Sequence, residues 1–406
     1  MSQEAGSKDR VRSPDGVKAR PMEMGSSRSG VKISRARIVG AKGVILLPSK
    51  GTKEKIAIIG AGPSGAYLAR LLSDSGYKID VFEGSYRLAL KPCGWGVPYT
   101  IDSVLRLPED AILVKVKGYK VYIGDKLIFE SHARHYGYII DKEIFLTELL
   151  SGIEVTRRWA DPASLDNYLL VVDARGHVAY PGPKALALQV EGRMKNAPRD
   201  EVHLFFFPEL VGYGWIFPMW GSHVKVGVGG KDRALVAGLF KRLVRTTGVE
   251  VNTPTKGSWI ASGGLRLYRH RSYYRIGEAA GAVMPLTGEG IRPSLITAIA
   301  AYREIKGEGG FRETLAKYNL FLNIRIQMAI LNALENASPE ERAVMLEMTP
   351  IEVLERVSAG DVTWEFLSKG VFKWPRFFLR IALQGGLGRV LGLPRRGSGK
   401  EEENAT

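Results

Sequence analysis

The stretch EKIAIIGAGPSGAYLARLLSDSGYKIDVFEG, residues 54–84, decides the fold of this chain. An apolar run, Ile56–Ile59, leads into a glycine-rich turn, and the following residues have the apolar spacing of a helix that Gly76 is placed to end. One face of this helix carries Ala66, Ala69 and Leu72. A second apolar strand over 78–82 completes the strand–helix–strand opening of a Rossmann-type domain.

The turn in this unit has the glycine spacing of a dinucleotide-binding site. Gly60 allows the tight turn, Gly62 lets a pyrophosphate approach the backbone, and Gly65 lets the helix pack on the sheet. The helix N-terminus offers free N–H groups to the phosphates, and a carboxylate after the second strand suits a ribose. The residues expected to contact the cofactor here are Gly60, Gly62, Pro63, Ser64, Gly65 and Glu83.

Composition excludes several classes of protein. A chain of 406 residues with 45% hydrophobic residues can bury a large core. Its single cysteine, Cys93, excludes intramolecular disulfides and zinc sites built from paired thiolates. His132 and His135 are the closest histidine pair but lack a pattern of accompanying ligands, so we expect no metal.

The net charge of +16 is unevenly distributed. Residues 1–53 carry twelve Lys or Arg against four Asp or Glu, which is about half of the excess. This segment is rich in Ser, Gly and Arg, and we expect a disordered basic extension without a signal peptide. A translation start nearer Lys53 is an alternative. Because the charge gathers in this extension, we do not expect a nucleic-acid partner.

The rest of the chain divides into segments of different periodicity. Residues 113–131 alternate like paired strands around a turn at Gly124-Asp125, 137–150 look like a short strand entering a helix, and 168–173 form a buried strand. The predicted fold is α/β: a Rossmann-type FAD-binding domain with an inserted antiparallel β-sheet substrate domain and a C-terminal helical region. The FAD-binding domain is expected over 54–112, 137–180 and 270–310, and the β-sheet substrate domain over 113–136 and 181–269. The C-terminal helical region is expected over 311–396, and a disordered tail over 397–406.

The choice of FAD rests on YRIGEAAGAVMPLTGEGIRPSLITAIAAYREI, residues 274–305. It resembles the second flavin fingerprint of the FAD family that includes p-hydroxybenzoate hydroxylase. That resemblance implies an acidic residue on the ribitol chain, here Glu278 where the family usually has Asp, and a helix beginning near Ile291. The positive end of such a helix would stabilise the negative edge of reduced flavin. The implied contacts are Glu278, Gly288, Gly290 and Ile291.

Within this superfamily the sequence is similar to the geranylgeranyl reductases, especially the archaeal enzymes that saturate isoprenoid chains of membrane lipids. The similarity lies in KPCGWG (91–96), YGWIFP (213–218) and GEAAGAVMPLTGEGI (277–291), with GYIIDKEIF (137–145) in support. It implies an FAD-dependent reductase of isolated C=C bonds that uses hydride from reduced flavin plus a proton. The external electron donor, NAD(P)H or ferredoxin, is left open, and a donor protein is a possible partner.

The same resemblance assigns site residues. Cys93, Tyr213 and Trp215 are the implied catalytic residues, and Gly94 allows close approach to the flavin. On a strand, Tyr213, Trp215 and Phe217 share one face. The implied wall for prenyl carbons is formed by Trp95, Tyr213, Trp215 and Phe217, with Phe205–Phe207 as an extension. The alternative is that these aromatic residues fill an ordinary core and that Cys93 is a small buried apolar group.

Other roles stay open at this level. Arg87 and Lys91 could reach the FAD phosphates or remain solvated, and Arg292 could touch flavin, a substrate phosphate or a salt-bridge partner. Residues 369–396 interleave basic and apolar side chains, which suits either an interfacial helix or a bundle that covers the channel. We expect a cytoplasmic protein, peripheral at the inner membrane face. An FAD monooxygenase and a flavin-binding protein without turnover are the alternative functions.

Overall fold

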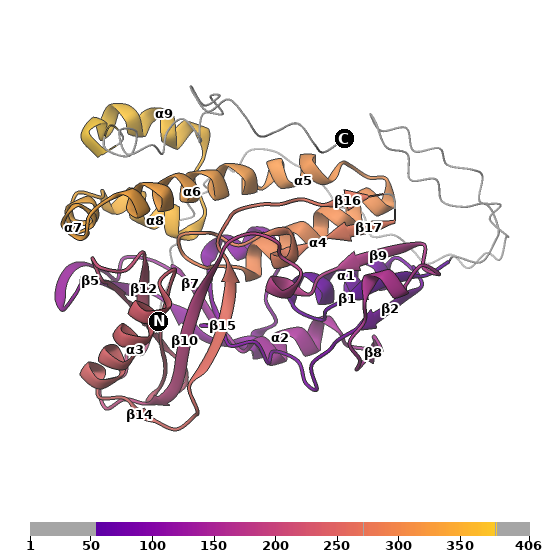
Figure 1. Cartoon of the computed structure of the whole chain (residues 1–406), viewed down its shortest axis with the longest axis horizontal. Helices are drawn as coiled ribbons and strands as arrows, with labels where there is room; N and C mark the ends of the chain where they lie inside the picture. The colour runs from indigo at the N-terminus through magenta and orange to yellow at the C-terminus, as the bar shows by residue number, and fades with distance from the viewer. Residues whose placement is uncertain (1–53, 271, 378, 380–406) are drawn as a thin grey trace, which may run out of the picture.

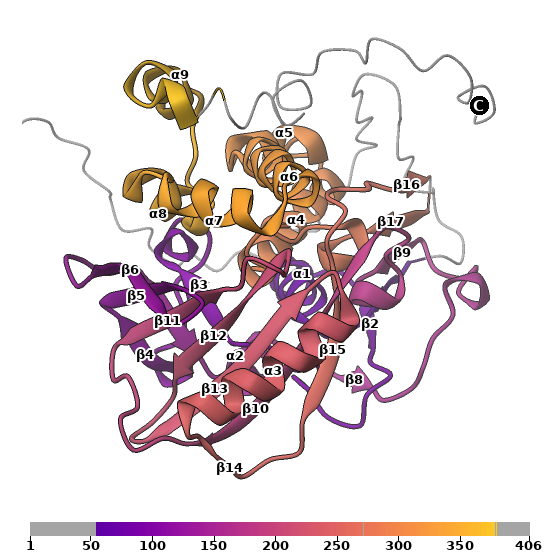
Figure 2. The same ribbon diagram turned by 60° about the vertical axis from the view of Figure 1, so that its left-hand side comes forward.

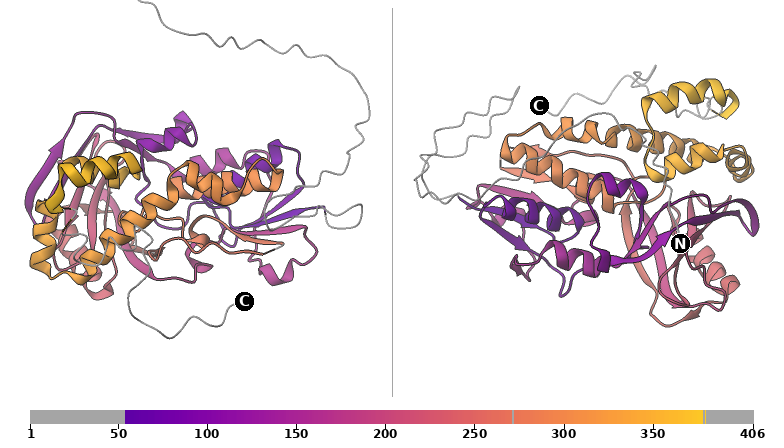
Figure 3. Two further views of the ribbon diagram at one scale, coloured as in Figure 1. Left: turned by 90° about the horizontal axis from the view of Figure 1, so that it is seen from above. Right: turned by 180° about the vertical axis from the view of Figure 1, so that it is seen from behind.

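The computed structural model describes residues 54–270, 272–377 and 379 (Figure 1). The expectations for the basic extension over 1–53 and the tail over 397–406 lie outside these residues, as does most of the basic and apolar segment 369–396. Two β-sheets lie side by side beneath a group of C-terminal helices (Figure 3).

The first sheet contains the predicted dinucleotide-binding unit. Its six strands run in the order β16-β17-β9-β1-β2-β8, and β1 pairs in parallel with both β2 and β9. The strands are β1 (Ile56–Ile59), β2 (Ile79–Phe82), β8 (Val155–Thr156), β9 (Leu170–Asp173), β16 (Arg269–His270) and β17 (Tyr273–Arg275). The buried strand expected over 168–173 is therefore confirmed as a neighbour of the first strand.

Three helices accompany this sheet. Helix α1 (Pro63–Asp74) follows the glycine turn, and Gly76 reverses the chain after it at a φ of 77°. Helix α4 (Ile291–Lys306) packs against α1 and begins at the predicted residue. Helix α2 (Lys142–Leu149) starts at Asp141, whose carboxylate accepts backbone N–H groups in the first turn. The predicted strand-to-helix passage over 137–150 is thus confirmed.

The second sheet is larger and runs in the order β14-β10-β13-β12-β11-β5-β6, with β15 also paired to β10. Its strands are β5 (Gly118–Ile123), β6 (Lys126–Ser131), β10 (Lys184–Arg193), β11 (Glu201–Phe206), β12 (Gly212–Pro218), β13 (His223–Gly230), β14 (Glu250–Val251) and β15 (Lys256–Ala261). The predicted hairpin at Gly124-Asp125 joins β5 and β6. One expectation needs correction, because β5 and β11 pair in parallel within an otherwise antiparallel sheet.

Sequence reasoning missed the helix of this sheet. Helix α3 (Arg233–Thr247) covers one face (Figure 2), whereas only a β-sheet was expected for the domain over 181–269. Asp232 caps its start and Gly248 ends it in the left-handed conformation. Its apolar side packs on the β13 face formed by Val224, Val226 and Val228. The opposite β13 face therefore carries Lys225, Gly227 and Gly229.

A small third sheet holds the segment after Cys93. Strand β7 (Gly137–Ile140) lies between β3 (Gly96–Pro98) and β4 (Ile112–Val116). The alternating segment 113–131 is therefore divided, because β4 pairs with β7 and only β5 and β6 pair with each other. This arrangement joins the 91–100 stretch to the start of α2.

From residue 311 the described chain is helical, as predicted. The helices are α5 (Phe311–Lys317), α6 (Leu320–Asn336), α7 (Pro339–Glu347), α8 (Ile351–Ala359) and α9 (Trp364–Lys373). Helices α7 and α8 lie over the large sheet, and α5 and α6 extend across toward α4 (Figures 1 and 2). In the part of the chain that the structure describes, no helix has the length and apolar character needed to cross a membrane.

Candidate functional site

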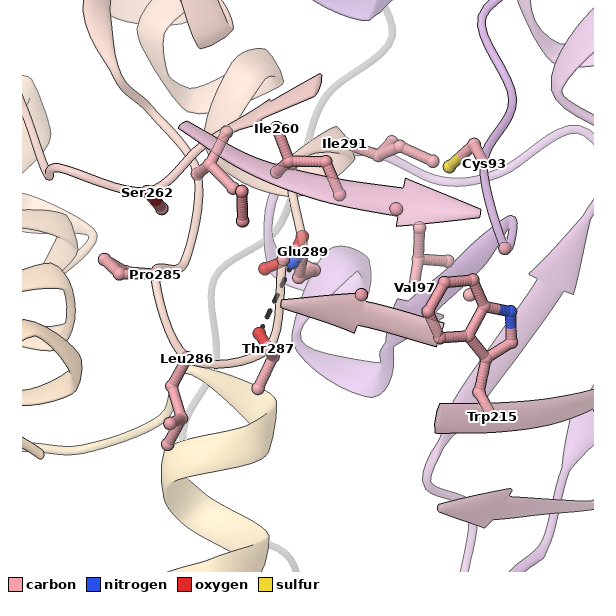
Figure 4. Close-up of a pocket in the computed structure, with 18 of the residues that line it drawn as sticks. Cys93, Val97, Trp215, Ile260, Ser262, Pro285, Leu286, Thr287, Glu289 and Ile291 are labelled. Atoms are coloured by element: carbon pink, nitrogen blue, oxygen red, sulfur yellow. Dashed lines mark hydrogen bonds between the residues drawn. The ribbon is translucent and has the colours of Figure 1, made fainter. Parts of the chain in front are cut away.

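A cavity of about 690 Å³ lies between the two sheets and the C-terminal helices (Figure 4). We call one part the dinucleotide end, which is lined by the glycine turn, Glu83 and Glu278. We call the other part the apolar end, which is lined by the aromatic residues of β12 and by helices α6 to α8. The Cys93 loop, residues 91–96, lines the same cavity.

The glycine turn has the geometry that a bound dinucleotide needs. Gly60 has a φ of 102°, and a Cβ on Gly65 would lie 1.8 Å from the Gly60 carbonyl oxygen. A Cβ on Gly62, by contrast, would meet no protein atom within 4 Å. The backbone at Gly62 therefore faces open space at the N-terminus of α1, where a phosphate could accept N–H groups.

Glu83 is fixed at the edge of this space by two backbone amides. One carboxylate oxygen accepts the Ala61 N–H at 2.8 Å, and the other accepts the Ser85 N–H at 2.8 Å. Each oxygen keeps a second lone pair, so the carboxylate can still accept from ribose hydroxyls. The residues of this end thus fit the adenosine and pyrophosphate part of a dinucleotide.

The second fingerprint approaches the same cavity from the other side. Gly277 has a φ of 60° and donates its N–H to the Thr297 hydroxyl at 2.8 Å, while Gly290 caps the start of α4. Glu278 accepts the Lys91 ammonium at 2.6 Å and the Ala261 N–H at 3.1 Å. The structure gives Lys91 a partner that neither expectation named, because its ammonium pairs with the predicted ribitol carboxylate.

Arg292 also has a defined partner. Its guanidinium lies 3.0 Å from the Glu289 carboxylate, and both side chains are buried. Glu289 additionally accepts the backbone N–H of Arg292 at 3.0 Å and lines the cavity. Burial raises the pKa of the Glu289 carboxyl, while Arg292 opposes this shift. Arg87 lies at the cavity wall, 3.9 Å from Glu143.

The Cys93 loop crosses close to the aromatic strand. A Cβ on Gly94 would lie 2.8 Å from the Phe217 ring, so only glycine permits this approach. Trp95 adopts a left-handed φ of 68°, which is unusual for a bulky residue. Cys93 lines the cavity, and its sulfur accepts the Trp95 N–H at 3.5 Å.

The aromatic side chains of β12 share one face, as predicted. The ring centroids of Tyr213 and Trp215 are 5.9 Å apart, and those of Trp215 and Phe217 are 6.3 Å apart. The Trp215 indole lies across β13, where a Cβ on Gly227 would meet it at 2.2 Å. Tyr213 donates its hydroxyl to the Thr287 carbonyl, and burial raises its pKa. This wall therefore faces the cavity rather than the core beneath α3.

The proposed extension of the wall is divided. Phe206 and Phe207 line the cavity, although Phe207 is also buried in the core beneath α3. Phe205 stacks on Tyr122 at a centroid distance of 4.8 Å and packs beside the same core. The opposite side of the apolar end is built by residues that sequence reasoning missed. They are Ile330, Leu334, Met345, Leu346, Val353 and Val357.

Two buried lysines near Cys93 were also missed. The Lys142 ammonium donates to the Lys91 carbonyl at 2.7 Å, and the Lys225 ammonium donates to the Cys93 carbonyl at 3.3 Å. Lys142 follows the Asp141 cap, and Lys225 interrupts a run of Val and Gly on β13. A lysine within this otherwise apolar strand was the feature of the sequence that could have identified Lys225.

The two histidines considered as ligands lie away from the cavity lining. His132 approaches Glu201 at 2.6 Å, and His135 packs on the Tyr138 ring. Within the described residues, no group of three His, Cys, Asp or Glu side chains could hold a metal ion.

Comparisons with known proteins agree with this geometry. The model of the NAD(P)-binding Rossmann-like domain matches residues 58–90. No curated protein sequence matches the chain. Among solved structures, a geranylgeranyl bacteriochlorophyll reductase-like protein from Thermoplasma acidophilum aligns at a TM-score of 0.64 and 15% identity, over 82% of this chain and 100% of that one. The chain has the fold of FAD-dependent oxidoreductases.

Other structures share this fold at similar distance. A flavoprotein/dehydrogenase from Cytophaga hutchinsonii aligns at a TM-score of 0.56 and 14% identity, over 84% of this chain and 99% of that one. The flavin-dependent halogenase CmlS aligns at a TM-score of 0.55 and 15% identity, over 82% of this chain and 72% of that one. The Rossmann match and these flavin proteins together support FAD as the cofactor. At such identities the likeness itself concerns the fold.

Proposed function

We propose that this protein is an FAD-dependent reductase that hydrogenates isolated C=C bonds of geranylgeranyl chains, in precursors of archaeal-type membrane lipids. The observation that carries the proposal is the joining of a dinucleotide end and an apolar end in one cavity. The reductase-like neighbour from Thermoplasma acidophilum adds support at the level of fold.

The dinucleotide end supplies the residues that would hold FAD. Gly62 and the N-terminus of α1 suit the pyrophosphate, Glu83 the ribose, and Glu278 the ribitol hydroxyls. Gly288, Gly290 and Ile291 present the N-terminus of α4 to the flavin. When bound, FAD supplies the hydride chemistry.

The apolar end supplies the environment that an isolated alkene needs. No carbonyl polarises such a bond, so its reduction depends on exclusion of water and on proton delivery to one carbon. Tyr213, Trp215 and Phe217 offer an aromatic wall to prenyl carbons. We place Cys93 beside the reacting carbons because its loop lines the cavity against this wall.

The test begins with the purified protein reduced chemically under anaerobic conditions. A geranylgeranylated lipid is added, and its mass is followed. We expect a gain of two hydrogens for each double bond reduced. Cys93→Ala should retain FAD and lose most of this activity, whereas full activity in that variant would remove Cys93 from the mechanism.

A monooxygenase is the second candidate, because a flavin-dependent halogenase shares the fold. It predicts an unchanged lipid in the anaerobic assay and a hydroxylated aromatic compound in air. Those two results together would replace the reductase proposal.

We further propose that the protein meets the inner membrane face at α9. Trp364, Val371 and Phe372 are exposed on this helix, and Phe372 is 87% exposed. Lys369 and Lys373 lie among them in exposed pairs with Glu365 and Glu352, and such weak surface pairs could exchange for anionic headgroups. Flotation with anionic liposomes should carry the protein upward, and absence of flotation with either anionic or neutral liposomes would contradict this contact.

A further inference from the structure

Lys225 is a buried charged residue at the centre of the large sheet. It is fully buried on β13, on the face that it shares with Gly227 and Gly229. Its neighbours in register are Phe217 on β12 and Glu191 on β10. Because removing an ammonium from water is costly, the contacts of Lys225 should explain why a lysine occupies this buried position.

Two of its contacts go to the Cys93 loop. The Lys225 nitrogen lies 2.8 Å from the centroid of the Trp95 ring and 3.3 Å from the Cys93 carbonyl oxygen. The third contact is an ion pair with Glu191 at 3.5 Å. A cation over an indole and a charge-assisted hydrogen bond are both strong when water is excluded.

The loop needs such support. Trp95 has a left-handed φ of 68°, which is unfavourable for a bulky residue, and Ala89 just before the loop has a φ of 58°. Lys142 holds the beginning of the loop through the Lys91 carbonyl. Lys225 holds its end, so the loop is fixed to α2 on one side and to the large sheet on the other.

We propose that Lys225 is a positioning residue whose ammonium clamps Cys93 and Trp95 onto the large sheet and thereby sets the place of the Cys93 thiol in the cavity. The proposal rests on the role given to Cys93 under "Proposed function". Lys225 itself is not among the cavity-lining residues, so it acts through the loop.

The clamp should respond to pH. Burial lowers the pKa of Lys225 to about 7; Glu191 from β10 and Cys93 from the loop oppose the shift, and Lys142 from α2 adds to it. Below this pH the ammonium is charged, and both contacts to the loop hold. Above it the cation–π contact is lost, and the loop is held only by the weaker hydrogen bond from the neutral amine to the Cys93 carbonyl. Loop position and pH are therefore linked through one side chain.

The single cysteine makes the loop measurable. The full-length protein, as purified, is treated with a thiol-alkylating reagent, and every label reports Cys93. At a pH below 7, Lys225→Met should be labelled about tenfold faster than the wild type, since loss of the two contacts removes on the order of 1–2 kcal/mol. Lys225→Arg should label at a rate nearer to that of the wild type.

Lys120→Met is the matched control. Lys120 lies on β5 of the same sheet, pairs with Glu201 and is absent from the cavity lining. It should label like the wild type. Equal labelling rates for a folded Lys225→Met and the wild type would overturn the proposal.

A second measurement uses tryptophan fluorescence across pH 7. We expect a transition near the pKa of about 7 in the wild type and in Lys120→Met, and none in Lys225→Met or Trp95→Leu. Trp95→Leu breaks the clamp from the loop side and serves if Lys225→Met fails to fold. A wild type without this transition would contradict the pH-dependent clamp. Neither readout needs lipid turnover, so either can fail while the reductase proposal stands.

Discussion

The two ends of the cavity are built in different ways. At the dinucleotide end, the glycine turn and Glu83 come from one short unit, and Glu278 joins them from a segment much later in the chain. The apolar end is assembled from β12, the Cys93 loop and helices that follow more than a hundred residues later. The glycine turn is a local structure, so its residues have a recognisable spacing in the sequence. The apolar end is formed by distant segments, so it can be seen only in the folded protein.

Substitution of the turn glycines gives the largest expected effect at the dinucleotide end. Gly65→Ala should lower the free energy of unfolding by about 4 kcal/mol or abolish folding, because its Cβ collides with the Gly60 carbonyl. Urea unfolding measures this loss.

Gly62→Ala is the matched variant, because its Cβ meets open space. It should change stability by about 0.5 kcal/mol or less and reduce FAD affinity about tenfold or more, measured by flavin titration of the apoprotein. Equal destabilisation by the two alanines would show that the turn lacks separate packing and binding positions.

Trp215 tests the apolar end. Trp215→Ala should cost about 3 kcal/mol of unfolding free energy, because the indole covers Gly227 and is 7% exposed. Flavin content should not change, and reduction of the lipid should fall. Trp215→Phe should retain most stability, since the indole N–H has no hydrogen-bond partner among the described residues. Loss of flavin from Trp215→Ala would mean that the two ends depend on each other.

Lys225 contacts the Cys93 loop, and its effect on stability has a defined sign. The pKa of Lys225 is about 7 in the folded protein and 10.5 as the reference value, so the unfolded chain binds more protons between these values. The contribution of this group to stability therefore rises with pH over that window. Below pH 7, Lys225→Met should be more stable than the wild type by about 2 kcal/mol, after loss of the loop contacts. The stability difference between Lys225→Met and the wild type should vanish near pH 10. A difference that does not depend on pH would contradict the lowered pKa of Lys225.

Substitution of Glu201 should have the smallest effect on stability, and it serves as a comparison because Glu201 does not line the cavity. Burial opposes its ionisation, but hydrogen bonds from His203, Lys120 and His132 hold its pKa at about 2. The lowered pKa adds stability above the reference value of 4.5, and this is lost as pH falls toward 2. Glu201→Gln should cost about 1 kcal/mol at neutral pH after solvent screening, and nothing near pH 2. Thermal melts at both pH values measure this difference.

Sequence reasoning reached the dinucleotide end because its constraints are local. The glycine spacing follows from what the turn must do, and the start of α4 at Ile291 was implied by the resemblance to the second flavin fingerprint. At the apolar end, only the shared face of Tyr213, Trp215 and Phe217 follows from a local rule, the strand period. Helix α3 was missed because its apolar residues lie between strong strand signals. The parallel pairing of β5 with β11 was missed because register between distant strands leaves no mark in either segment.

The remaining site residues could be identified only from tertiary contacts in the folded protein. Nothing near Lys225 in the sequence indicates Trp95, which precedes it by 130 residues. Likewise, Ile330 and Val353 look like ordinary helix-core positions, and only the placement of α6 and α8 makes them cavity walls. Glu278 was predicted as a ribitol contact, but its pairing with Lys91 depends on how the loop folds back.

The attachment of α8 to the strands has a consequence for how a long chain could reach the cavity. Glu355 accepts hydrogen bonds from Tyr119, Tyr136 and Arg134, while the buried apolar residues of α8 pack with α6. Water can replace these polar links at small cost, whereas it cannot replace the packing within the helices. The helical cover is thus held to the strands by polar links and to α6 by apolar packing. We expect a long apolar chain to enter the cavity more easily where the polar links to α8 open than through the packed helices.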